Sequence, residues 1–225
     1  MSKFAGELFS LEGRIALVSG ASSGIGRHMG QTLARAGANV VLVARREAKL
    51  MRVVKTINAE NVGKVSALAG DLSERDEISR VAKEATSPFG APDILINAAG
   101  INLREPAGDV SWDSWGRTLD LNLSAPFFLA KALVSNMQEK GLGNIINIAS
   151  MQSFRAFTNG IAYGASKGGI MQLTRAMAET WSKDGIVANA IAPGFFPTEL
   201  TQPVFSDPQL VAHNASMTAV GRNGE

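Results

Sequence analysis

Residues 19–26 read SGASSGIG and separate two segments that differ in the pattern of their apolar side chains. Before this stretch, residues 14–20 (RIALVSG) are rich in aliphatic side chains and end in glycine, which is typical of a buried strand. After it, residues 25–35 place apolar side chains four positions apart, which predicts one face of a helix. We therefore interpret residues 19–26 as the tight turn of a strand–turn–helix unit.

The glycines of this turn favour a phosphate-binding role. Gly20, Gly24 and Gly26 have the spacing GxxxGxG. Glycine lets the backbone approach a pyrophosphate closely, and the free N–H groups at a helix N-terminus attract negative charge. A purely structural turn also favours glycine, whereas a Walker P-loop is excluded because no Gly-Lys-Ser/Thr follows. The residues expected to hold a dinucleotide here are Gly20, Ser22, Ser23, Gly24, Ile25 and Gly26.

The rest of the chain repeats this alternation of strands and helices. Strands that are apolar throughout indicate a parallel sheet covered on both faces. The longest helix is expected at 114–140, bent near Pro126, which lacks a backbone donor. The further strands are expected at 39–45, 64–71, 93–97, 144–150 and 186–194. The sequence predicts an α/β fold, a doubly wound parallel sheet of the Rossmann type with helices on both faces and about six strands, in a single domain over residues 1–225.

Composition excludes several classes of function. The 225 residues carry a net charge of only +2, and Lys and Arg are scattered, so we expect no nucleic-acid partner. There is no cysteine, and the two histidines, His28 and His213, are far apart, so we expect no metal site. No apolar run is long enough to span a bilayer and no signal-peptide pattern is present, so we expect a cytoplasmic protein with no membrane partner.

The end of the second expected strand indicates which nicotinamide cofactor is preferred. An acidic residue there would accept hydrogen bonds from the ribose 2′-hydroxyl of NAD(H), but this sequence has Arg45 and Arg46. Two guanidinium groups favour a 2′-phosphate through charge-assisted hydrogen bonds. The alternative is a solvated basic turn without a ligand. We predict that NADP(H) is preferred over NAD(H).

The only tyrosine, Tyr163, precedes Lys167 by four positions, so both side chains share one face of the helix expected at 162–183. A nearby cation favours a phenolate and lowers the pKa of a phenol from its usual value of about 10. Such a phenol can give a proton to a carbonyl oxygen or remove one from an alcohol. Ser150, at the end of the fifth expected strand, can donate to the same oxygen. An idle helix face is the alternative interpretation of the Tyr–Lys spacing.

The ordered motifs SGASSGIG, GDL, NAAG, LNLSAPF, NIINIAS, YGASK and APGFFPT resemble those of the short-chain dehydrogenase/reductase family from about residue 11 onward. The resemblance implies a general acid/base (Tyr163), a substrate polariser (Ser150), a ribose ligand that lowers the tyrosine pKa (Lys167) and a proton-relay residue (Asn122). It also implies contacts to the bound cofactor by Asp71, Leu72, Asn97, Ala98, Gly100, Tyr163, Lys167, Pro193, Gly194 and Thr198. Ser19 and Ala98 are small departures from the motifs.

A larger departure lies at the C-terminus. Chains of the family normally continue past residues 221–225 (GRNGE) through a helix, a seventh strand and a glycine-rich turn. We therefore expect a C-terminally incomplete domain whose seventh strand is missing and whose sixth strand is an unprotected edge. A homo-oligomer, dimer or tetramer, is expected if the C-terminus is complete. The alternative to an enzyme is a catalytically silent dinucleotide-binding protein or an inactive fragment.

The predicted function is hydride transfer between NADP(H) and a secondary alcohol or ketone. The segment from residue 195 resembles the gluconate 5-dehydrogenase branch, which implies a polyol or keto-sugar acid as the small-molecule substrate. A cationic side chain could bind its carboxylate, unless Arg104 and Arg155 are idle surface residues. Residues 195–217 are expected to form a substrate lid. The substrate contacts are expected from Ser150, Gln152, Arg155, Tyr163 and Phe195, with Arg104, Phe154, Asn159 and Phe196 nearby. A sugar epimerase of the extended branch would carry GxxGxxG, which is absent.

Overall fold

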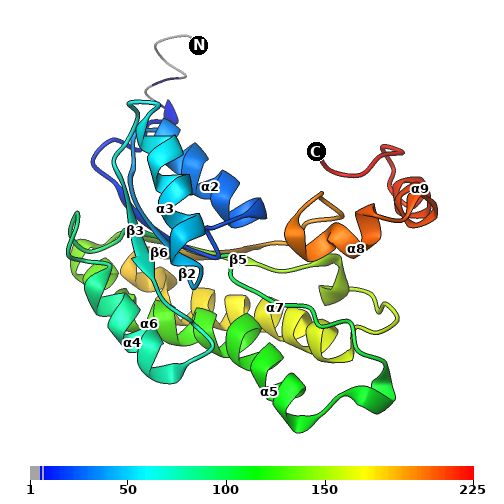
Figure 1. Cartoon of the computed structure of the whole chain (residues 1–225). Coiled ribbons are helices and arrows are strands. Elements are labelled where there is room, and N and C mark those ends of the chain that lie inside the picture. The colour runs from blue at the N-terminus through cyan, green and yellow to red at the C-terminus, as the bar shows by residue number, and fades with distance from the viewer. Residues whose placement is uncertain (1–5, 7) are drawn as a thin grey trace.

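The computed structural model describes Gly6 and residues 8–225, which form one six-stranded parallel sheet (Figure 1). The strands are β1 (Ile15–Ser19), β2 (Asn39–Ala44), β3 (Val65–Ala69), β4 (Ile94–Asn97), β5 (Gly143–Ile148) and β6 (Ile186–Ile191). Their order is β3-β2-β1-β4-β5-β6, and every neighbouring pair is parallel. The chain winds outward from β1 to β3 and then crosses to β4 on the other side of β1. The doubly wound fold is therefore confirmed, with its switch point between β1 and β4.

Helices cover both faces of the sheet, and Figure 1 shows them as two groups. On one face lie α2 (Gly24–Arg35) and α3 (Glu47–Asn58); on the other lie α4 (Arg75–Glu84), α6 (Ala125–Lys140) and α7 (Ile161–Trp181). Side chains alternate between the faces along each strand. In β1, Ala16 and Val18 join the core under α2 and α3, whereas Leu17 joins the core under α4 and α6. This two-sided burial explains the uninterrupted apolar runs of the strands.

The long helix expected at 114–140 is present as one continuous helical run over residues 112–140, but its irregularity is a π turn that ends just before Pro126. The structure has α5 (Trp112–Leu119), a π-helical turn (Asp120–Ser124) and then α6. Pro126 follows this π turn directly, and its ring and missing N–H disfavour the regular helical bond to the carbonyl of residue 122, four positions earlier. The break in the helical pattern lies at the π turn, which carries Asn122.

After β6 the chain lies over the carboxyl ends of the strands and forms a 3-10 turn (Glu199–Thr201), α8 (Gln202–Phe205) and α9 (Pro208–Ser216). Figure 1 shows α8 and α9 in orange and red, apart from the helices that cover the sheet. Thr198 packs on the turn after β1, as shown by the 3.1 Å distance between its side chain and the position that a Cβ on Gly24 would take. Among the residues that the structure describes, no helix is long and apolar enough to cross a bilayer.

Candidate active site

A cavity of about 930 Å³ lies at the carboxyl ends of the strands. It is lined by the turn after β1, the ends of β2 and β3, the loops after β4, β5 and β6, and the start of α7. The predicted site residues line it, except for two asparagines, Asn97 and Asn122, and for Phe154, which is 65% exposed. The lining residues that the sequence predicted are Gly20, Ser22, Ser23, Gly24, Ile25, Gly26, Arg45, Arg46, Asp71, Leu72, Ala98, Gly100, Ser150, Gln152, Arg155, Tyr163, Lys167, Pro193, Gly194, Phe195 and Thr198.

The glycines of the turn after β1 are required by their surroundings. Gly20 has φ +66°, and a Cβ there would lie 2.6 Å from the Ala98 carbonyl oxygen. A Cβ on Gly26 would lie 2.7 Å from the Gly20 carbonyl oxygen. Ser19 fixes the neighbouring loop, because its Oγ accepts hydrogen bonds from the N–H groups of Ala98 and Ala99, both at 3.1 Å. The departures at Ser19 and Ala98 therefore leave the floor of the cavity intact.

The two arginines after β2 point to different partners. Arg45 Nη1 lies 3.4 Å from Asp71 Oδ2, whereas Arg46 Nη2 donates to the hydroxyls of Ser22 and Ser23 at 3.2 and 3.3 Å. Lys49 lies beside Arg46, since both contact one carboxylate, that of Glu199. Lys49 was not predicted as a site residue, although its position three residues after Arg46 places both on one side of the start of α3. We name Ser22, Ser23, Arg46 and Lys49 the anion corner.

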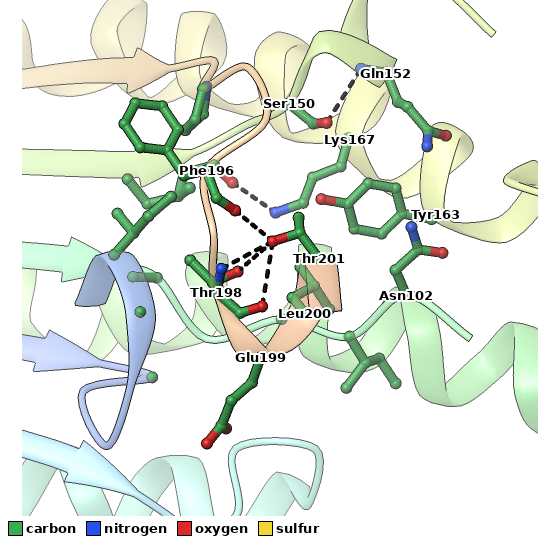
Figure 2. A pocket seen from close by; sticks show the side chains of 18 of the residues that line it. Asn102, Ser150, Gln152, Tyr163, Lys167, Phe196, Thr198, Glu199, Leu200 and Thr201 are labelled. Atoms are coloured by element: carbon green, nitrogen blue, oxygen red, sulfur yellow. Dashed lines mark hydrogen bonds between the residues drawn. The ribbon is translucent and has the colours of Figure 1, made fainter. Parts of the chain in front are cut away.

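Tyr163, Lys167 and Ser150 surround one part of the cavity (Figure 2). Tyr163 is buried, and Lys167 Nζ lies 5.6 Å from the centre of its ring. Lys167 Nζ donates a 2.6 Å hydrogen bond to the carbonyl oxygen of Ile148, at the end of β5. Ser150 Oγ accepts a 3.1 Å hydrogen bond from the N–H of Gln152. Figure 2 shows the phenolic oxygen pointing into the space beside Lys167, with Asn102 next to the ring.

The protonation of the pair differs from the sequence expectation. Burial raises the pKa of Tyr163, and this exceeds the lowering by the Ser150 hydroxyl and the Arg104 charge. Burial also lowers the pKa of Lys167 to about 8. The expected lowering of the tyrosine pKa by Lys167 is not found, because the ammonium is directed at the Ile148 carbonyl and is itself desolvated. At neutral pH the phenol carries its proton and can donate it.

The two predicted asparagines outside the cavity lining make buried hydrogen bonds. Asn97 Nδ2 donates to Asn147 Oδ1 at 2.9 Å, which links β4 to β5. Asn122 Oδ1 accepts from the N–H of Ile101, and its Nδ2 donates to the carbonyl oxygen of Ile101, both at 2.9 Å. A Cβ on Gly100 would lie 3.1 Å from Asn122 Oδ1 and 3.8 Å from Lys167 Nζ. Asn122 therefore lies behind the cavity wall, close to Lys167.

Polar and cationic groups lie around the phenol. Gln152 Oε1 is buried and has no hydrogen-bond partner among the described residues. Arg104 has φ +57°, an uncommon conformation for a non-glycine residue, and its Nη2 donates to the Leu200 carbonyl oxygen at 3.1 Å. Arg155 instead lies over the ring of Phe157, 5.2 Å from its centre. Within the described part of the chain no cluster of His, Cys, Asp or Glu could hold a metal ion.

Comparison with known proteins places the chain among dehydrogenases. A family model described as short chain dehydrogenase matches residues 14–209. Gluconate 5-dehydrogenase of Gluconobacter oxydans is 37% identical over 219 residues, which are 97% of this chain and 85% of that protein. 2-Dehydro-3-deoxy-D-gluconate 5-dehydrogenase of Escherichia coli is 37% identical, with 96% and 85% covered. The crystal structure of gluconate 5-dehydrogenase from Burkholderia cenocepacia in complex with NADP and tartrate has a TM-score of 0.91 at 35% identity, with 98% and 86% covered.

Proposed function

The chain belongs to the short-chain dehydrogenase family, and we propose that it transfers a hydride between NADP(H) and a secondary alcohol or ketone of a polyhydroxy acid. One observation supports this most strongly: Tyr163, Lys167 and Ser150 line the same cavity as the glycine turn after β1. The groups that could move a proton therefore lie within reach of the groups that could hold a dinucleotide. NADP(H) is the favoured cofactor because related structures contain NADP and the anion corner suits a 2′-phosphate.

In this proposal Tyr163 is the general acid for ketone reduction. The bound cofactor supplies the hydride, and the phenol gives its proton to the carbonyl oxygen on which negative charge develops. The Ser150 hydroxyl donates a hydrogen bond to the same oxygen. In the reverse direction the phenolate removes the proton of the alcohol, so alcohol oxidation needs a deprotonated Tyr163.

Lys167 and Asn122 would return a proton to the phenol. Lys167 has a pKa of about 8, so it can both hold and release a proton near neutral pH. Asn122 is fixed by its hydrogen bonds to the Ile101 backbone and to Ser166 Oγ, the latter at 3.0 Å. We assign Lys167 to cofactor ribose binding and proton exchange, and Asn122 to positioning of a water molecule beside it.

The substrate proposal rests on charge and hydrogen-bonding capacity near the phenol. Two relatives are named for gluconate or dehydro-deoxy-gluconate, and a related crystal structure contains tartrate. Arg104 would bind the carboxylate of such an acid, because it lines the same cavity as Tyr163. Gln152 also lines the cavity, and its side-chain amide would bond a substrate hydroxyl. Ser150, Arg155 and Phe195 complete the proposed contacts, and residues 195–217 would close over them as a lid.

The test is a substrate screen. Purified protein should oxidise NADPH in the presence of keto-sugar acids, and should do so faster than with neutral ketones of the same size. A silent dinucleotide-binding protein would bind NADPH without consuming it with any of these compounds. The family membership and the complete Ser150, Tyr163 and Lys167 set favour the enzyme.

We also propose that the chain forms a homo-oligomer. Trp112 of α5 is 89% exposed and Phe128 of α6 is 50% exposed, and large apolar side chains in this position favour burial against another chain. Light scattering of the purified protein should give a multiple of 23.7 kDa, whereas a monomer would contradict the proposal. The cytoplasmic location and the single-domain boundary stay predictions.

A further inference from the structure

Glu199 connects the segment after β6 to the anion corner. Its Oε2 lies 2.6 Å from Arg46 Nη2 and accepts a 3.0 Å hydrogen bond from Ser23 Oγ, while Oε1 pairs with Lys49. Figure 2 shows its side chain pointing away from Tyr163 and Lys167. One carboxylate thus contacts the turn after β1 and two cations of α3 at the same time.

The backbone holds Glu199 in this position. The preceding residue, Thr198, packs against Gly24, and its N–H donates to Thr201 Oγ1 at 2.9 Å. The side chain of Thr201 also bonds the carbonyl oxygen of Phe196. Glu199 therefore begins a 3-10 turn that is held by these hydrogen bonds and packs on the turn after β1. Its backbone is fixed, and its carboxylate extends to the anion corner.

The groups that contact Glu199 are those expected to bind a phosphate. A serine hydroxyl, a guanidinium and an ammonium converge on one point, a donor set that suits a dianion. The pKa of Lys49 is lowered, first by partial burial and then by the charges of Arg46, Arg52 and Arg27, although the ion pair with Glu199 acts in the opposite direction. Arg46 and Lys49 together carry two positive charges at this corner, and one carboxylate neutralises only part of them.

We propose that Glu199 is an internal counter-ion that occupies the position of the cofactor's 2′-phosphate, so that a 2′-phosphorylated nucleotide must displace it. The proposal rests on the proposed function in one respect, that the cofactor binds along the glycine turn. It makes Glu199 a specificity-determining residue, because displacement weakens binding of NADP(H) but not of NAD(H), which carries no 2′-phosphate.

Charge and exposure make the exchange feasible. Glu199 and Arg46 are each about half exposed, with side-chain exposures of 49% and 50%, and exposed ion pairs contribute little to stability. A phosphate carries roughly −1.5 to −2 charges near neutral pH, against −1 for a carboxylate. The electrostatic attraction of the phosphate to Arg46 and Lys49 is therefore stronger than the attraction of the Glu199 carboxylate that it replaces. Once displaced, Glu199 no longer ties the segment after β6 to α3.

The test is calorimetric binding of NADPH, NADH and 2′,5′-ADP to the full chain and to Glu199→Gln. We expect the variant to bind NADPH and 2′,5′-ADP about fivefold more tightly, the size expected for two exposed ion pairs, and NADH unchanged. Glu47→Gln is the matched control, because Glu47 is exposed in the first turn of α3 and forms no ion pair within the described chain. Glu47→Gln should change NADPH affinity by less than twofold. When Arg46 is replaced by Ala, the increase in NADPH affinity caused by Glu199→Gln should be smaller.

A second readout, amide hydrogen exchange, also reports on the protein without cofactor. In the free protein, amide hydrogen exchange of residues 198–217 should be faster in Glu199→Gln than in the wild type, and saturating NADPH should remove the difference. Unchanged or weaker NADPH binding by the variant would refute the displacement of Glu199 by the 2′-phosphate. Weaker binding would also indicate that Glu199 contacts the bound cofactor. If neither the wild type nor Glu199→Gln binds NADPH while their amide hydrogen exchange still differs, the proposed function fails. The contact of Glu199 with the anion corner is then still supported.

Discussion

At the scale of single residues, the proposed chemistry depends on how burial sets the charge of Tyr163 and Lys167. The phenol has a raised pKa, which favours proton donation, and the ammonium has a pKa lowered to about 8, which favours exchange near neutral pH. The sequence predicted the residues from their spacing but not these directions. Spacing along a helix shows that two side chains share a face, whereas desolvation depends on the elements packed around them.

Lys167 should give stability a characteristic dependence on pH. The folded pKa of about 8 lies below the unfolded value of about 10.4, so the unfolded state binds more protons between these values and stability rises with pH there. Relative to Lys167→Met, the wild type should gain about 2 kcal/mol of unfolding free energy between pH 7 and pH 9.5, below the raised pKa of Tyr163. Denaturant unfolding at both pH values measures this. An identical pH dependence in the two proteins would contradict a desolvated lysine.

Arg104 should determine affinity for an acidic substrate. Arg104→Ala should raise KM for a keto-sugar acid about tenfold or more, because a charge-assisted contact to the carboxylate is lost, and it should leave KM for a neutral ketone within about twofold. Arg175→Ala is the matched control, since Arg175 is exposed on α7, bonds to Gln172 and does not line the cavity. If Arg104→Ala raised KM equally for the acidic and the neutral substrate, or no more than the control variant did, carboxylate binding by Arg104 would be ruled out.

At the scale of elements, the turn after β1 is the part most fully predicted by sequence. Gly20→Ala should destabilise the fold by about 2–4 kcal/mol, because the residue has φ +66° and the new Cβ would lie 2.6 Å from a backbone oxygen. Gly116→Ala in α5 is the control, since a Cβ there meets no atom within 4 Å and should stabilise the helix by up to about 1 kcal/mol. Chemical denaturation compares them, and a neutral Gly20→Ala would contradict the turn geometry.

The helix between β4 and β5 shows where sequence patterns are insufficient. The period of apolar residues predicted one helix over 114–140, and Pro126 predicted a bend in it. The irregularity is a π turn, which adds one residue to a turn of helix; it spans residues 120–124, includes Asn122 and ends just before Pro126. Such turns occur often at functional sites, which agrees with the position of Asn122 close to Lys167.

At the scale of the whole molecule, the site is the meeting point of segments far apart in sequence. The parallel doubly wound sheet and the cavity position followed from the strand–helix alternation, because such a sheet places ligands at its carboxyl edge. The partners of Arg45 and Arg46 did not follow. Asp71 comes from the end of β3 and Glu199 from beyond β6, so these contacts depend on the placement of separate elements.

The central claim is that Tyr163 moves the proton while NADPH is consumed at the same cavity. The most direct measurement follows NADPH absorbance with a reactive keto-sugar acid for the wild type and for Tyr163→Phe, together with NADPH affinity by calorimetry. We predict that the variant loses at least about 100-fold in kcat, as expected for a lost general acid, and binds NADPH within about twofold of the wild type. A variant that retains most of the wild-type kcat would contradict the account.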